Sequence, residues 1–279
     1  MLKRFRRLVS WTLGLRENPF VVCQRQSESR QTIWKRFWTG YGLYSALLVI
    51  PLLLGVSAVR NFGLGRPASM VEFIVVLLAF AQVLYVALKA VVQTAASVVN
   101  ERQRGTLLSL ALTQVNSADY ADGIVAAGIR PVVREITVLM PLAGLIGWFA
   151  GADLFSILML WAVSVLMAVI FGYVGVWISA GSTSTQQATQ KATIQALFFI
   201  LIAPFLMVFA GFWAFPLWIV HPYVALSLAF WGKSDLYQPD PFSYMLVRWW
   251  ALLALPLYFW IASSCRRKAI RALERTHLI

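Results

Sequence analysis

Six long apolar segments constrain what this chain can fold into more than any other feature. The first runs from about Tyr41 to Ala58 and the second from Met70 to Val99. The third is centred on Ile136 to Ala150 and the fourth on Leu154 to Ala180, and the last two cover Thr193 to Val220 and Tyr244 to Ser264. A helix needs about 20 apolar residues to cross the hydrocarbon core of a membrane, with some latitude for tilt. The third segment is the weakest, because Arg130, Arg134 and Glu135 stand at its start. The segments predict an all-α integral membrane protein with six transmembrane helices.

The supply and placement of charge agree with a membrane environment. Charged residues make up 13% of the 279 residues, whereas a soluble domain carries roughly a quarter. The net charge of +13 would fit a nucleic-acid-binding protein, but the Lys and Arg residues gather at the chain ends and in short loops. We therefore expect membrane lipid, and no nucleic acid, among the partners.

Lys and Arg at the two ends also predict the orientation. An even number of spans puts both ends on one side, and the positive-inside rule makes that side the cytoplasm. Loops on the other side hold only Arg60, Arg66 and Lys233. We expect a multi-pass protein of the plasma (inner) membrane with both termini cytoplasmic. The chain then divides into a basic N-terminus (1–40), a transmembrane domain (41–264) and a basic cytoplasmic tail (265–279).

A short helix is expected before the first span. Asn18 can cap free backbone N–H groups and Pro19 suits the first helical turn. Apolar, polar and aromatic stretches then follow one another up to Trp38, which is typical of an amphipathic helix lying in the membrane interface. A basic anchor without a moving part fits the same residues.

The loop after the second span carries the most specific motif. Glu101, Arg102 and Arg104 mark the exit into the cytoplasm. Gly105 breaks the backbone and Thr106 can cap a new helix. The leucines that follow supply an apolar surface too short to cross the membrane. Such a surface either lies among lipid headgroups or docks on a partner.

These motifs resemble the permeases of the type-2 ABC exporter class. The family typically shows an Asn-Pro start to an interfacial elbow helix and a Glu-x-x-x-Gly-Thr-Leu-x-x-Leu-x-x-Thr stretch after the second span. The first is matched by Asn18-Pro19, and the second by Glu101, Gly105, Thr106, Leu107, Leu110 and Thr113. Ser179 and the polar loop 181–191 are similar to the family's loop between the fourth and fifth spans. The chain departs from the family at Cys23-Gln24, where a basic-acidic pair is common.

The resemblance implies a function and partners. The stretch 101–113 would be the coupling helix that docks on a separate ABC ATPase subunit, and residues 221–243 would form an extracellular gate. A second permease, identical or related, would complete the transport path. ATP and Mg would bind to the ATPase subunit, because this chain has no P-loop and no cofactor site of its own. Export is the expected direction, and the transported substrate stays open.

Two other classes of function would require different residues from a transporter. A non-transporting anchor or scaffold would share the topology without needing the 101–113 motif. A membrane enzyme would need a cluster of catalytic side chains at one depth, and the spans carry no paired carboxylates and no central His. We expect no catalytic residue and no metal site. Lys89 and Glu135 fall at similar depth and are predicted to form an intramembrane ion pair, although Lys89 reaching the interface alone is equally compatible.

Overall fold

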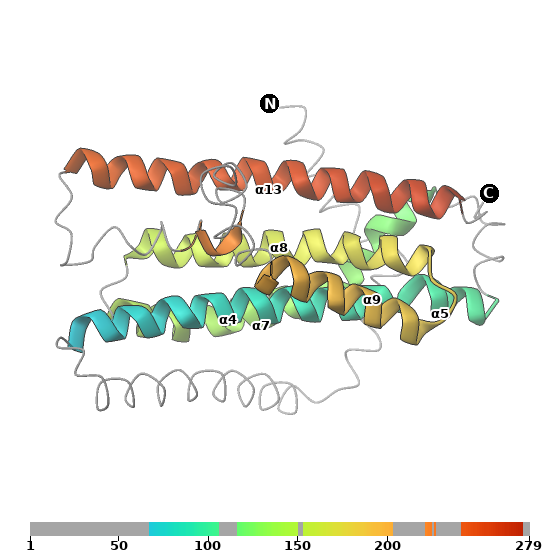
Figure 1. The fold of residues 1–279 in the computed structure, drawn as a ribbon, viewed down its shortest axis with the longest axis horizontal. Helices are drawn as coiled ribbons and strands as arrows, with labels where there is room; N and C mark the ends of the chain where they lie inside the picture. Colours follow the sequence, from blue (N-terminus) through green and yellow to red (C-terminus); the bar gives the residue numbers. More distant parts are fainter. Residues whose placement is uncertain are drawn as a thin grey trace.

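The computed structural model describes residues 67–105, 116–149, 153–202, 221–224, 226 and 241–275, and the regular elements in these ranges are helices (Figure 1). The α-helices are α4 (Pro67–Ala95), α5 (Ser97–Gln103), α7 (Ser117–Phe149), α8 (Leu154–Ala180), α9 (Thr185–Leu197) and α13 (Pro241–Arg275). A short π-helix, η1 (Phe198–Ile202), continues directly from α9. The all-α expectation therefore holds for the described part of the chain.

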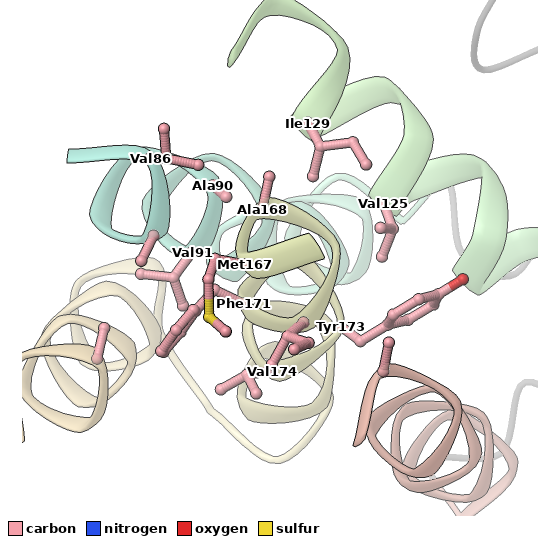
Figure 2. Packing of buried hydrophobic residues seen from close by; sticks show 14 of the residues in the cluster. Val86, Ala90, Val91, Val125, Ile129, Met167, Ala168, Phe171, Tyr173 and Val174 are labelled. Carbon is pink, nitrogen blue, oxygen red and sulfur yellow. The ribbon is translucent and has the colours of Figure 1, made fainter. Parts of the chain in front are cut away.

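Helix α8 lies at the centre of the bundle. It packs against α4, α7, α9 and α13, and Figure 1 shows it between α13 and the pair formed by α4 and α7. Its sequence is apolar all round, which is typical of a helix in a protein core or in a membrane. Met167, Phe171 and Val174 are among its buried side chains (Figure 2). Two helical stretches, Leu77–Gln103 and Leu154–Ala180, are long and apolar enough to cross a membrane.

Small residues allow α4 to approach α7 and α8 closely. Thr94 of α4 lies beside Gly128 of α7 and Gly175 of α8. A Cβ atom at Gly128 would come within 2.6 Å of Thr94 Cγ2. The Thr94 hydroxyl hydrogen-bonds within its own helix, to the Ala90 carbonyl at 2.9 Å. Small residues at helix contacts are typical of membrane bundles, because close packing replaces the hydrophobic driving force there.

Several boundaries differ from those expected from hydropathy. Helix α8 matches its segment, but α7 begins at Ser117 rather than near Ile136. The Asn116 side chain accepts a hydrogen bond from the Ala118 N–H at 3.1 Å, so a polar cap starts a helix that the apolar run does not reveal. Helix α13 continues to Arg275, well into the expected tail, because Ala269 and Leu273 are buried.

The loop expected over 181–191 is shorter than predicted. Only residues 181–184 are non-helical, because the Ser184 side chain accepts a hydrogen bond from the Gln187 N–H and starts α9. Helix α9 is mostly polar, but every fourth residue on one face is a buried alanine: Ala188, Ala192 and Ala196. Small apolar side chains at this spacing allow a mostly polar helix to pack on α4 and α8.

The described part of the fifth apolar segment is helical: α9 ends at Leu197 and the π-helix η1 covers Phe198–Ile202. Residues 203–220 lie outside the described residues, so the fifth span over Thr193–Val220 stays a prediction. His221 Nε2 lies 3.1 Å from the Phe199 carbonyl oxygen. The side chains of Phe199, His221 and Tyr223 form adjacent ring contacts there.

Candidate functional site

One end of the bundle gathers the start of the predicted coupling segment and several basic side chains. There α5, the first turns of α7, the turn 181–184 and the last turns of α13 lie close together, and we call this region the basic end (Figure 1). It includes Arg102, Arg104, Arg266, Arg267, Lys268, Arg271 and Arg275. Asn18, Pro19, Thr106, Leu107, Leu110 and Thr113 lie outside the described residues.

Helix α5 is attached to the end of α8 by its polar groups. Arg102 donates to two backbone carbonyls, of Ala180 at 2.9 Å and of Ser182 at 3.1 Å. Ala180 is the last residue of α8 and Ser182 lies in the turn after it, where carbonyl acceptors have no partner within the helix. The Val99 N–H donates to the Ser179 hydroxyl at 3.2 Å, and the Thr185 hydroxyl donates to Asn100 at 2.9 Å. The chain thus enters the predicted coupling segment from a fixed position on α8 and α9.

Two residues of the motif are described at the end of α5. Gly105 has φ of +71°, the left-handed conformation that favours glycine after a helix C-terminus. Glu101 lies in the last turn of α5, near Tyr120 at the start of α7. Burial raises the pKa of Tyr120 above its ordinary value, and the Glu101 carboxylate raises it further. The motif glycine therefore ends α5 as the sequence predicts, and Glu101 faces the next helix.

We expect Arg102→Ala to loosen this connection. The two hydrogen bonds are charge-assisted but Arg102 is exposed, so the loss of unfolding free energy should be about 1–2 kcal/mol. Hydrogen exchange should become faster in residues 179–185 and in α5. Arg104→Ala is the matched control, because the exposed Arg104 side chain makes no hydrogen bond or ion pair in the described residues. Equal exchange in both variants would contradict the assignment.

Lys89 and Glu135 lie in contact, with Tyr85 as a third member. The Lys89 ammonium forms an ion pair with Glu135 Oε2 and also donates to the Tyr85 hydroxyl at 2.7 Å. The Tyr85 hydroxyl donates to the same carboxylate oxygen at 2.9 Å. The charged side chains are 25% and 28% exposed, so the pair is mostly removed from solvent. The two residues chosen from sequence by depth are thus brought together, and Tyr85 was missed.

A double-mutant cycle tests the energetic role of this pair. Lys89→Met and Glu135→Gln should each destabilise the purified chain, because each leaves a mostly buried charge without its partner. The double variant should be more stable than the sum of the single losses predicts, with a coupling free energy of about 1–3 kcal/mol. Thermal unfolding in mild detergent measures it. Additive losses would show that the contact contributes no interaction energy.

A second polar cluster was not foreseen from the sequence. Asp122 of α7, which is 5% exposed, accepts from the Tyr173 hydroxyl of α8 at 2.8 Å. Arg266 of α13 binds both oxygens of the same carboxylate, at 2.8 Å through Nε and 2.6 Å through Nη2. Hydrogen bonding to Asp122 raises the pKa of Arg266. The cluster ties three helices together at the basic end, but its members are far apart in sequence.

The described residues contain no cluster of three or more His, Cys, Asp or Glu side chains that could hold a metal ion. His221 is buried and uses both ring nitrogens, toward the Phe199 carbonyl and the Tyr223 N–H. Its contacts are those of a packed side chain within the helical bundle. Comparison with known protein families gives no match to this chain, and no significant relative is found among curated proteins.

Proposed function

We propose that this chain is the transmembrane permease subunit of an ABC exporter. Six spans would place both termini in the cytoplasm of the inner membrane. The segment 101–113 would dock on a separate ATPase subunit, which binds ATP and Mg. A second permease subunit would complete the transport path, with residues 221–243 as the extracellular gate. The observation that carries the proposal is the Glu101–Thr113 motif, which begins in a helix held against α8 and includes a glycine with positive φ.

The location of this motif supports a mechanical role. Arg102 and Val99 link α5 to the end of α8, and Thr185 links it to the start of α9. A displacement of the docked segment would therefore reach two long helices directly. Helix α8 in turn contacts α4, α7 and α13. A non-transporting scaffold would have no need for this mechanical connection between its docking segment and the bundle.

Exposed apolar side chains support the membrane setting. Trp249, Leu253 and Trp260 of α13 are 59%, 57% and 63% exposed. Leu154 and Leu158 of α8 are 65% and 55% exposed. Large apolar surfaces of this kind favour contact with lipid or with another membrane subunit. Together with the two stretches able to span, they support a membrane location for the chain.

Affinity purification in mild detergent tests the proposal. A P-loop ATPase should co-purify with the tagged chain. It should be lost when Leu107, Leu110 and Thr113 are replaced together by Glu, because charged side chains cannot enter an apolar docking groove. Replacing Leu252, Leu253 and Phe259 of α13 by Ala is the control and should leave the ATPase bound. Recovery of a folded chain with no ATPase would contradict the proposal and favour a scaffold.

A further inference from the structure

Two arginines of α7 lie at the depth of the middle of α8. Ile129 of α7 lies against Gly172 of α8, and the Trp161 indole donates to Thr137 of α7 at 3.3 Å. Arg130 and Arg134 fall between these two contacts. Their level on α8 is therefore about 10 Å or more of helix from either end of Leu154–Ala180. From the sequence, Arg130 and Arg134 were expected at the start of the third span, nearer the membrane interface.

Neither arginine has an acidic partner in the described part of the chain. Two acids of α7 are already engaged: Asp122, at the basic end, by Arg266 and Tyr173, and Glu135, next to Arg134, by Lys89 and Tyr85. The Arg130 Nη1 atom is buried and makes no hydrogen bond. Arg134 is exposed one turn further along the helix. Cations at membrane depth are costly, so they pair, bind a ligand or line a wet cavity.

The same face of α7 becomes apolar beyond the arginines. Val138, one turn after Arg134, is 48% exposed, and Pro141 is also exposed. This direction leads away from the basic end. The face thus presents two guanidinium groups followed by an apolar surface. A free inorganic anion would use only the first part, whereas an anionic amphiphile would use both.

We propose that Arg130 and Arg134 bind the anionic headgroup of an amphiphile, of the phospholipid class, whose apolar tail lies along α7 toward Val138 and Pro141. Guanidinium groups form strong, charge-assisted hydrogen bonds with phosphate oxygens. The inference rests on the proposed function in placing α7 at membrane depth, and it adds the chemical class of a ligand, as cargo or as a resident lipid.

Native mass spectrometry of the purified full-length chain, in detergent with equal phosphatidylglycerol and phosphatidylcholine of one chain length, tests this. Wild type should prefer phosphatidylglycerol by about tenfold, as expected for one or two charge-assisted contacts. Arg130→Gln with Arg134→Gln should abolish the preference. The control variant, Arg267→Gln with Arg271→Gln, removes the same charge from an exposed face of α13 and should retain the preference for phosphatidylglycerol. An Arg130→Lys, Arg134→Lys variant should retain a reduced preference.

Three results would overturn the site. Wild type could bind the two lipids equally, the α13 control could lose as much preference as the α7 variant, or glycerol phosphate could displace the lipid as well as phosphatidylglycerol does. The last would identify a soluble anion as the ligand. If the Gln variant fails to fold by thermal unfolding, wild type and the Lys variant decide. If the chain prefers the anionic lipid but no ATPase co-purifies, only the proposed function is refuted. If an ATPase co-purifies but the chain shows no lipid preference, only this lipid site is refuted.

Discussion

Replacing Arg266 with Met is expected to lower the free energy of unfolding by about 3 kcal/mol, near the lower limit for breaking a buried ion pair. Asp122 is 8% exposed in its side chain and would keep only the Tyr173 hydroxyl as a partner. The Arg266 side chain is 39% exposed, so its own desolvation contributes little to the change in the free energy of unfolding. The large effect comes from the carboxylate left behind in α7.

The neighbouring residue provides the control. Arg267 is exposed and contacts the Ser264 hydroxyl at 3.0 Å, so Arg267→Met should cost less than about 0.5 kcal/mol. Adding Asp122→Asn to Arg266→Met should recover much of the loss, because the uncompensated charge is then gone. Thermal unfolding of the purified chain measures all three variants. A double variant that is less stable than Arg266→Met alone would contradict this account of the cluster.

Gly175→Ala is expected to destabilise the bundle by about 2–3 kcal/mol through overpacking. A Cβ atom at this position of α8 would lie 2.9 Å from the Val91 carbonyl oxygen and 3.1 Å from the Ala95 nitrogen, and would overlap the Thr94 side chain. The Val91 oxygen and the Ala95 nitrogen are backbone atoms of α4, and they cannot move without shifting the helix. For that reason Thr94→Ala should not restore the stability of Gly175→Ala.

Two other glycines make the comparison specific. A Cβ atom at Gly172 would meet only the side chains of Ile129 and Val125, each at 3.0 Å, so Gly172→Ala should cost less than Gly175→Ala. At Gly144 of α7 the nearest described atom would be 3.9 Å away. Gly144→Ala should be neutral or slightly stabilising, because Ala has the higher helix propensity. Thermal unfolding in detergent measures the stability of these variants. If Gly175→Ala is as stable as Gly144→Ala, the close approach of α4 and α8 is contradicted.

The sequence predicts uniformly apolar elements well. Helix α8 begins and ends where its apolar run does, between the Asp153 cap and Gly181. The Lys89–Glu135 contact was also foreseen, because costly charges in neighbouring helices at similar depth favour pairing. Hydropathy did not reveal the first half of α7, whose start depends on a polar cap at Asn116.

The polar cluster at the basic end shows the limit of sequence reasoning. Asp122 and Arg266 are 144 residues apart, and no local pattern connects them. Only the packing of α7, α8 and α13 brings the carboxylate to the guanidinium. Within the predicted coupling motif, the glycine was predicted correctly as the break after α5, since few other residues adopt its positive φ. The links from Arg102 to α8 require the tertiary structure.

Photocrosslinking in native membranes tests the central claim most directly. A photoreactive amino acid is placed at Leu110, within the predicted coupling segment, and a control probe at Trp249, an exposed position of α13. Docking of the segment on an ATPase predicts an adduct with a P-loop ATPase from position 110 and none from position 249. Adducts from position 110 only with lipid, or only with a protein that lacks a P-loop, would contradict the assignment of this chain as an ABC exporter permease.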